Sequence, residues 1–171
     1  MLDVVTENDS VTGRASIKDC LENGLLHRAV AVLVVRSDGR VLLQQRSKKD
    51  LWQPGLWTLS CTGHVGAEED YDQAEVRELN EELGLTAELV AVKKYLLPPI
   101  RSGKLTEREW VMLYVARTEM LCRIDTIEVE KVEEVDEPRL RRMFHDGSMT
   151  PDAVILLTDL LKYIGSHPSG A

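Results

Sequence analysis

The sequence predicts one mixed domain of the α+β or α/β class, and three observations support this. Apolar runs typical of buried strands, such as residues 29–35 (AVAVLVV), alternate with helical patterns along the chain. The length of 171 residues is that of a domain with a substantial core. Neither an internal repeat nor a linker divides the sequence. We therefore expect residues 1–171 to form a single domain.

The N-terminal part predicts a hairpin, a helix and a pair of strands. Residues 2–16 alternate apolar and polar positions around a polar turn, which indicates a β-hairpin. A short helix follows over 17–24, with Ser16 as its N-cap and Gly24 as its stop. The apolar stretch 27–35 predicts a buried strand, and a turn at 37–40 leads to a returning strand over 41–47.

The middle of the chain predicts a loop, a strand and one clear helix. Residues 48–57 contain a Pro-Gly pair and indicate a loop, and 57–63 indicate a short strand. Between 71 and 83 the apolar residues form a helical stripe. Gly84 ends this helix.

The C-terminal half predicts strands followed by helices. Strands are expected over 86–97 and 107–118, joined by a loop over 98–106, with a further strand over 124–135. Two closing helices are expected. They span 138–147 and 150–164, the second with Thr150 as N-cap and Pro151 at its first position, before a frayed tail over 165–171.

Composition and charge exclude several function classes. The formal net charge of −8 argues against binding to a nucleic-acid polymer, which requires a basic face. No apolar run approaches the length of a membrane span. The three cysteines (Cys20, Cys61 and Cys122) are widely spaced and predict neither disulfides nor a zinc site. With no secretory pattern at the start, we expect a cytoplasmic protein.

The helix over 70–83 carries a dense group of carboxylates. Glu78, Glu81 and Glu82 stand at i, i+3 and i+4, so they are neighbours on one face. Carboxylates at such short distances repel one another unless a cation lies among them. Ligands that are all oxygen atoms favour Mg²⁺ or Mn²⁺ as this cation. Arg77 can reach Glu81 one turn away, and Glu69 can fold back from the preceding loop. A metal site of this kind suits reactions at phosphate oxygens.

Residues 63–85 resemble the Nudix box, Gly-x5-Glu-x7-Arg-Glu-U-x-Glu-Glu-x-Gly-U with U aliphatic, at every fixed position. The matching residues are Gly63, Glu69, Arg77, Glu78, Leu79, Glu81, Glu82, Gly84 and Leu85. At ordinary residue frequencies the chance of this match is on the order of 10⁻⁶. A merely solvated acidic helix is therefore a poor explanation.

The resemblance to the Nudix superfamily covers roughly residues 25–165 and implies a fold and a reaction. The fold would be an α/β/α sandwich with a mixed central sheet, in which the box forms a loop–helix–loop. The reaction would be hydrolysis, dependent on Mg²⁺ or Mn²⁺, of the diphosphate linkage in a nucleoside diphosphate derivative or similar small molecule. Homodimers are common in this superfamily.

The resemblance also implies roles for individual residues. The metal ligands would be Glu78, Glu81 and Glu82, supported by Glu69 and by the backbone carbonyl of Thr62. Arg77 would orient the glutamates. The general base is open between Glu78 and an acid outside the box, for which Glu109 is the candidate.

A second resemblance points to a branch of the superfamily with different chemistry, the type I isopentenyl-diphosphate isomerases. Residues 24–35, 42–47, 54–64 and 107–110 have counterparts there. The resemblance places His27, His64, Glu107 and Glu109 on metal and acid/base positions of the isomerase.

Three departures weaken the isomerase interpretation. Thr62 occupies the position of the essential cysteine, and Cys61 lies one residue early, which on a strand directs it to the opposite face. Cys20 replaces one metal-binding histidine, and the Nudix box is complete where isomerases usually have a degraded one. We predict a hydrolase, with the isomerase as the alternative and a non-catalytic nucleotide-sensing domain as a further alternative.

Four residues are candidates for substrate binding. Arg46 and Lys49 could hold phosphates, although solvated surface charge is an equally ordinary role for a lysine. Trp52 stands in a polar loop and could contact a ligand, whereas Trp57 has apolar neighbours and is expected in the core. His64 follows Gly63 directly, so its backbone lies near the box whatever its side chain does.

Overall fold

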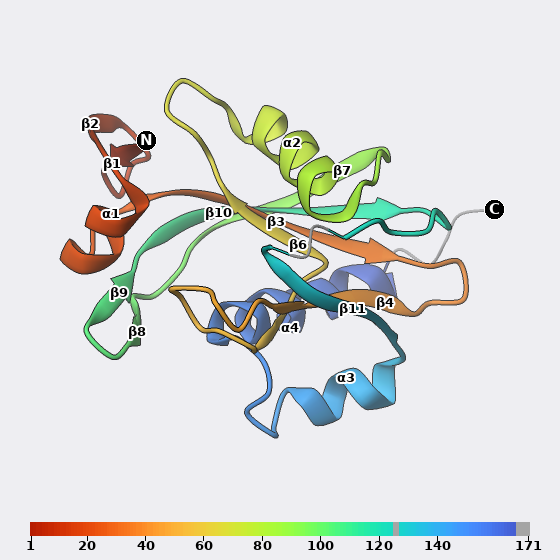
Figure 1. Cartoon of the computed structure of the whole chain (residues 1–171). Helices are drawn as coiled ribbons and strands as arrows, with labels where there is room; N and C mark the ends of the chain where they lie inside the picture. Colours follow the sequence, from red (N-terminus) through yellow and green to blue (C-terminus); the bar gives the residue numbers. More distant parts are fainter. Residues whose placement is uncertain (125–126, 167–171) are drawn as a thin grey trace.

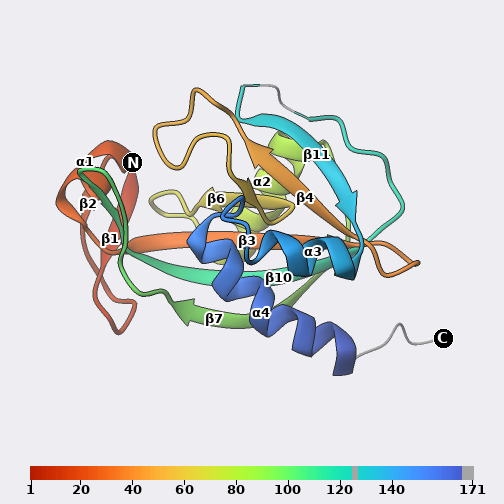
Figure 2. The same cartoon turned by 90° about the horizontal axis from the view of Figure 1, so that it is seen from below.

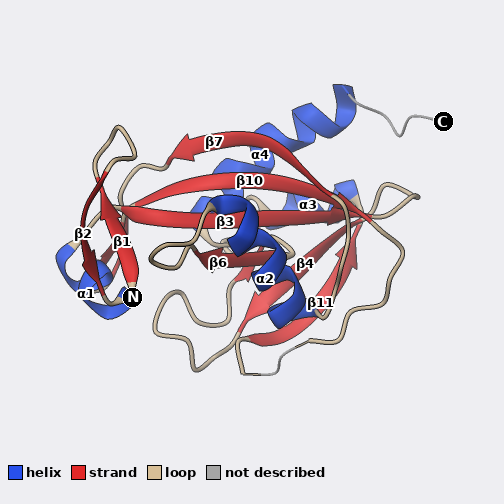
Figure 3. Ribbon diagram, turned by 90° about the horizontal axis from the view of Figure 1, so that it is seen from above, coloured by secondary structure: helices blue, strands red, loops and turns tan. Residues whose placement is uncertain are grey.

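A mixed β-sheet forms the middle layer of three in the computed structural model, which describes residues 1–124 and 127–166 (Figure 1). Helix α2 (Tyr71–Leu83) covers one face of the sheet (Figure 3). Helices α3 (Glu137–Met143) and α4 (Pro151–Ser166) cover the other (Figure 2). The predicted α/β/α sandwich is therefore confirmed. None of the described helices combines the length and apolar composition that a bilayer crossing requires.

Five strands form the main path of the sheet. In spatial order they are β11 (Val129–Val135), β4 (Val41–Arg46), β3 (His27–Val35), β10 (Glu109–Arg117) and β7 (Leu89–Leu96). β10 runs parallel to β3 and antiparallel to β7, and β11 runs antiparallel to β4. β3 and β4 pair at the turn that joins them, where Val35 lies opposite Val41.

Beyond that turn β3 and β4 separate, and two short strands fill the gap. β5 (Trp57–Thr58) pairs with β4, and β6 (Cys61–His64) pairs with β3. The prediction of one strand over 57–63 is wrong, because the chain crosses here from β4, with which β5 pairs, to β3, with which β6 pairs. The buried Ser60 hydroxyl secures the crossing, since it accepts a hydrogen bond from Val34 N (2.7 Å) and donates one to the Leu42 carbonyl on β4. The divergence leaves an opening in the sheet.

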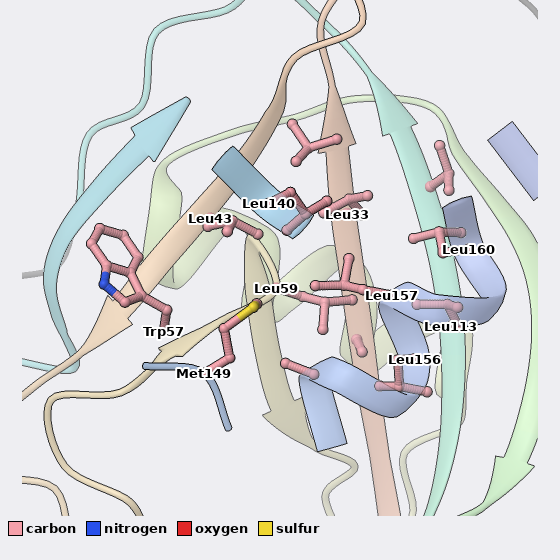
Figure 4. Packing of buried hydrophobic residues seen from close by; sticks show 14 of the residues in the cluster. Leu33, Leu43, Trp57, Leu59, Leu113, Leu140, Met149, Leu156, Leu157 and Leu160 are labelled. Atoms are coloured by element: carbon pink, nitrogen blue, oxygen red, sulfur yellow. The ribbon is translucent and has the colours of Figure 1, made fainter. Parts of the chain in front are cut away.

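The apolar run on β3 is buried on both faces, as predicted. Ala29, Ala31, Leu33 and Val35 face α3 and α4, whereas the alternate residues Val30, Val32 and Val34 face α2. Figure 4 shows leucines that pack together between the sheet and the helices α3 and α4; they are Leu33, Leu43, Leu113, Leu156, Leu157 and Leu160. Each such side chain contributes about 1.5–3 kcal/mol when buried.

The N-terminal elements agree with the prediction. β1 (Leu2–Val5) and β2 (Val11–Ala15) form a hairpin, and α1 (Ile17–Asn23) follows. The Ser16 hydroxyl caps α1 by accepting a hydrogen bond from Asp19 N (3.1 Å). Gly24 ends the helix in the left-handed conformation, with φ of 60°.

Two predictions for the C-terminal half need correction. Residues 98–106 form a hairpin and not a loop: β8 (Ile100–Ser102) pairs with β9 (Leu105–Glu107) around Gly103, whose φ is 59°. Strands of three residues are too short to give a readable alternation. The tail expected over 165–171 begins too early, because α4 continues to Ser166; residues 167–171 lie outside the described part.

Candidate active site

A cavity of about 780 Å³ opens where β3 and β4 separate. Its walls come from α1, β3, β4, β6, α2, β9 and β10, from the loops before β5 and before β11, and from the start of α4. Of the predicted site residues, all except Glu69 and His27 border this cavity. They are Arg46, Lys49, Trp52, Thr62, His64, Arg77, Glu78, Glu81, Glu82, Glu107 and Glu109. The fold thus brings together residues that are up to 63 positions apart in a sequence of 171 residues.

Both ends of α2 are fixed by local hydrogen bonds. Asp70 accepts from Gln73 N (2.8 Å), and the Gln73 side chain accepts in return from Asp70 N (3.1 Å), which forms a capping box. Gly84 ends the helix with φ of 60°. Because Leu79 and Leu83 are buried against the sheet, the rotation of α2 is set by the core. The box glutamates therefore border the cavity in a fixed register.

Arg77 connects four acceptors around the mouth of the site. Its Nε and Nη2 donate to the Glu69 carboxylate at 2.8 and 2.9 Å. Its Nη1 lies 2.7 Å from Glu78 Oε1 and 3.2 Å from Glu81 Oε2, and Nη2 also donates to the His64 carbonyl (3.0 Å). Glu69 does not border the cavity itself. It acts on the site through Arg77, and its role as a metal ligand stays a prediction.

Gly63 allows the Glu78 carboxylate to lie directly against the β6 backbone. A Cβ atom at position 63 would stand 2.1 Å from Glu78 Cδ and 2.3 Å from its Oε1. Any other residue would displace this carboxylate. The first glycine of the box therefore has a steric function that the spacing alone does not explain.

Glu82 is the most buried of the box glutamates, at 5% exposure. Its Oε2 accepts hydrogen bonds from Gln44 Nε2 (3.1 Å) and Thr62 N (3.3 Å). Burial, with repulsion from Glu78, raises the pKa of Glu82 to about 8. Burial likewise raises the pKa of Glu78 despite the neighbouring Arg77. Within the described residues Glu82 has no cationic partner, so a divalent cation beside it would relieve an unfavourable arrangement.

A second group of ligands lies on the β3–β6–β10 side of the cavity. Glu109 Oε1 is 3.4 Å from His27 Nε2 and 3.5 Å from His64 Nε2, and the ligand atoms lie within 4.8 Å of one another. Burial favours protonation of Glu109, but the two histidines outweigh it and lower its pKa, so the group stays ionised. This set also suits a divalent cation.

Glu107 and Glu109 both border the cavity, but they are not on one strand as predicted. β9 ends at Glu107 and β10 begins at Glu109, with Arg108 between them. Glu107 is not part of the group formed by His27, His64 and Glu109. Burial raises the pKa of Glu107 well above its ordinary range.

The predicted substrate-binding residues have contacts of their own. Arg46 donates to the Trp52 carbonyl (3.0 Å) and pairs with Asp50 (2.9 Å) while bordering the cavity. Trp52 is more buried than its polar surroundings suggested, at 6% exposure, and packs on Leu21 and Ile100. Trp57 lies in the core, as predicted. The substrate-binding roles of Arg46, Lys49, Trp52 and His64 stay predictions.

The cysteine next to the site does not border the cavity, although its thiol lies beside the Glu82 carboxylate. Cys61 is fully buried and packs in the apolar layer under α2, and burial raises its pKa. Thr62 borders the cavity in its place. The prediction that the side chains of Cys61 and Thr62 point to opposite faces of their strand is therefore confirmed.

Sequence reasoning missed Gln44, Gln53 and Asp152, all of which border the cavity. Gln44 follows the apolar residues 41–43 on β4, and a polar residue within a strand predicted to be buried was a usable signal; in the structure it is 3% exposed. Asp152 in the first turn of α4 resembles ordinary helix capping. Its place in the cavity depends on the packing of α4 against the sheet.

Comparison with known proteins identifies relatives of two kinds. A family model described as NUDIX domain matches residues 25–153. An isopentenyl-diphosphate Delta-isomerase from Serratia proteamaculans is 39% identical over 115 residues, which cover 67% of this chain and 64% of the relative. A second isomerase, from Photorhabdus laumondii, is 31% identical over 147 residues, covering 86% and 83%. An uncharacterised Nudix hydrolase from Streptomyces coelicolor is 43% identical over 84 residues, covering 49% and 46%.

Solved structures support the fold. A Deinococcus radiodurans protein superimposes with a TM-score of 0.78 at 21% identity, covering 92% of this chain and 97% of that one. A Caenorhabditis elegans Ap4A hydrolase superimposes with a TM-score of 0.61 at 19% identity, covering 81% and 98%. At such identities the likeness concerns the fold alone.

Proposed function

This chain belongs to the NUDIX domain family, and on that premise we propose that it is a Mg²⁺-dependent hydrolase of diphosphate linkages in small molecules. One observation carries the proposal. Glu78, Glu81 and Glu82 border a single cavity, and two of them are buried with raised pKa values. Carboxylates in this state are suited to a divalent cation, for which Mn²⁺ is the alternative.

The residues have distinct roles in the proposed reaction. Glu78, Glu81, Glu82 and the Thr62 carbonyl would hold the cation. When bound, the cation neutralises charge on the phosphate oxygens and lowers the pKa of water. Gln44 and Arg77 are positioning residues, since Gln44 donates to Glu82 and Arg77 donates to Glu81.

Hydrolysis adds one water across the phosphorus–oxygen bond of the diphosphate. The water oxygen bonds to phosphorus, the bridging oxygen leaves with the other phosphate, and the proton of the water passes to a carboxylate. Glu78 and Glu109 are the candidate bases. The lowered pKa of Glu109 keeps it able to accept a proton at neutral pH.

The second candidate is an isopentenyl-diphosphate isomerase. The named relatives favour this function over hydrolysis. The group of His27, His64 and Glu109 also falls on the metal and acid/base positions of that enzyme. This isomerase moves a double bond, which requires a group that protonates one carbon and a group that removes a proton from another.

We prefer hydrolysis because of the residue at position 62. The isomerase would need a thiol where Thr62 borders the cavity, and a hydroxyl with a pKa far above neutral is a poor proton donor and acceptor. Cys61 does not border the cavity and packs in the apolar layer under α2. The carboxylates of α2, in contrast, border the cavity together, which supports chemistry at phosphate.

Product analysis tests the proposal. The protein would be incubated with Mg²⁺ and a panel of nucleoside diphosphate derivatives, and separately with isopentenyl diphosphate. We expect cleavage of at least one nucleotide and no conversion to dimethylallyl diphosphate. The Glu82→Gln variant should lose at least about 100-fold in rate, because a neutral amide holds a divalent cation weakly. An exposed acid changed in the same way, Glu22→Gln on α1, serves as the control.

Two results would contradict the hydrolase. Formation of dimethylallyl diphosphate without any hydrolysis would establish the isomerase. Full hydrolytic activity in Glu82→Gln would mean that the α2 carboxylates are not the catalytic metal site.

A further inference from the structure

The loop that joins β6 to α2 holds Arg77 in place. We call this loop, residues 65–70, the box loop. Within it Glu69 accepts a hydrogen bond from Gly66 N (2.7 Å), and Arg77 donates to both oxygens of this carboxylate. Arg77 also contacts two glutamates of α2 that border the cavity. The position of the box loop therefore influences where the carboxylates of the candidate cation site lie.

The first half of the box loop lies against β1 of the N-terminal hairpin (Figure 1). Leu2 forms an isolated antiparallel bridge with Gly66, and Ala67 N donates a hydrogen bond to the Met1 carbonyl (2.9 Å). β1 also pairs with β2, so the loop runs beside a two-stranded sheet. These main-chain contacts determine the place of the first half of the box loop.

The middle of the box loop has an unfavourable backbone conformation that a side chain of β2 supports. Glu68 has a φ of +70°, in the left-handed region that residues other than glycine rarely adopt. Such a conformation persists where the surrounding structure holds it. Arg14 makes that contact, since its Nη2 lies 2.8 Å from Glu68 Oε1, and its Nε lies 3.2 Å from Asp3 Oδ1 on β1. The hairpin therefore also holds the residue next to Glu69.

The turn of the hairpin contacts the other end of the box loop, where α2 begins. Asp9 Oδ2 accepts a hydrogen bond from the hydroxyl of Tyr71, the first residue of α2, at 3.2 Å. Asp9 is itself bound to the sheet, by Arg28 of β3 (2.6 Å) and by Lys94 of β7. The hairpin thus connects the start of α2 to two strands.

Burial of apolar surface does not account for these contacts. The apolar side chains of the hairpin belong to a cluster around α1 that includes no residue of the box loop or of α2; its members are Leu2, Val4, Ala15, Ile17, Cys20 and Leu25. The hairpin meets the box loop and α2 through backbone contacts, an ion pair and a hydroxyl, which add little buried apolar area. Exposed polar contacts of this type orient a segment more than they stabilise the fold.

Resting on the proposed diphosphate hydrolysis, we propose that the N-terminal hairpin positions the box loop and, through Arg77, the carboxylates that would hold the cation. Asp9 and Arg14 are the positioning residues. Arg14 acts on the box loop at Glu68, and Asp9 acts on α2 at Tyr71. Among the described residues, none from β1 or β2 borders the cavity, so this effect is indirect.

Two substitutions release one contact each. Tyr71→Phe removes the hydroxyl that donates to Asp9 and keeps the aromatic ring. Glu68→Gln removes the charge that pairs with Arg14 and leaves the pairing of Arg14 with Asp3 intact. The double variant combines both changes. It is expected to fold, because the ring that packs against the apolar layer under α2 is retained and the Glu68 side chain is exposed.

Matched control substitutions remove the same kinds of contact elsewhere. Tyr95→Phe loses a hydroxyl hydrogen bond to Asp159 of the same length, 3.2 Å. Glu133→Gln loses an ion pair with Arg139 (2.7 Å). Tyr95 lies on β7 and Glu133 on β11, and neither of these two residues borders the cavity. The double control therefore measures the effect of such changes away from the box loop.

The first measurement is the affinity for Mn²⁺ without substrate, from the electron paramagnetic resonance signal of the free ion. We expect the double variant to bind Mn²⁺ about tenfold more weakly, the lower end of the effect of changing the partners of metal ligands, because the hairpin acts one contact further out. kcat should fall by a similar factor. Backbone amides of the box loop should exchange with deuterium faster than in the wild-type protein. The urea midpoint should stay unchanged, since exposed polar contacts contribute little to stability.

These readouts separate the inference from the hydrolase proposal. Wild-type Mn²⁺ affinity in the double variant overturns the inference, and cleavage of a diphosphate by the same protein leaves the hydrolase intact. Weaker Mn²⁺ binding with faster exchange in the box loop supports the inference even where no diphosphate is cleaved. An equal loss in the double control overturns it, because the effect then does not depend on the hairpin. A wild-type protein that binds no Mn²⁺ also overturns it, since the hairpin would have no cation site to position.

Discussion

Substitution of Gly63 by alanine tests the close approach between β6 and α2. A Cβ atom at this position would lie 2.1 Å from Glu78 Cδ, 2.3 Å from its Oε1 and 2.4 Å from its Cγ. Ordinary van der Waals contact begins at 3.4 Å. The Glu78 carboxylate must therefore leave its place beside the Thr62–Gly63 backbone and swing into the cavity.

The loss of activity follows from that displacement. A shift on the order of 1 Å in a positioned group costs about 100-fold in rate. We expect kcat of Gly63→Ala to fall by about 100-fold or more. The free energy of unfolding should change by no more than about 1 kcal/mol, because Gly63 does not have a positive φ and the carboxylate can move into open space.

The assay is product release from whichever diphosphate the wild-type protein cleaves, alongside urea unfolding. Gly13→Ala is the matched control, since no atom lies within 4 Å of its added Cβ. Wild-type kcat in Gly63→Ala, with normal stability, would refute the assignment of Glu78 to the site.

Three further predictions concern stability and the choice of reaction. Burial raises the pKa of Glu75 to about 8 from 4.5, so its stabilising protonated form is lost as pH rises between these values. Glu75→Gln should therefore increase the free energy of unfolding at pH 8 by about 2 kcal/mol and flatten its pH dependence; parallel curves for both proteins would contradict this. Asp9→Ala should destabilise the fold by about 2 kcal/mol in urea titrations, because Asp9 joins the N-terminal hairpin to Arg28 and Lys94; an unchanged midpoint would show that the hairpin is held by other contacts. Cys61→Ala should retain hydrolysis within about tenfold, and loss of activity in a folded protein would favour the isomerase.

Most of the secondary structure was predictable because its signals are local. The cap at Ser16 and the left-handed Gly24 bound α1 as expected. The period of the apolar residues defined α2 over Tyr71–Leu83. The β8–β9 hairpin was missed because three-residue strands carry no readable pattern, and the crossing at Ser60 was missed because it depends on two other strands.

For the site, the sequence predicted the carboxylates of α2, since their spacing on a helix is a local property. It also predicted that Cys61 and Thr62 face opposite sides, because strand residues alternate. Glu107 and Glu109, which the second resemblance singled out, both border the cavity, although a break at Arg108 separates their strands.

By itself, the sequence determined the residues of the Nudix box, because their spacing is fixed along one helix and its flanking loops, and the resemblance that they carry implied the family and the α/β/α layering. Only the tertiary structure decided where β3 and β4 separate, and hence where the cavity lies. It placed Gln44 against Glu82 and brought Asp152 to the same cavity as Glu107. These contacts join residues that are far apart in the chain. Their proximity arises from the packing of whole elements, which no local pattern encodes.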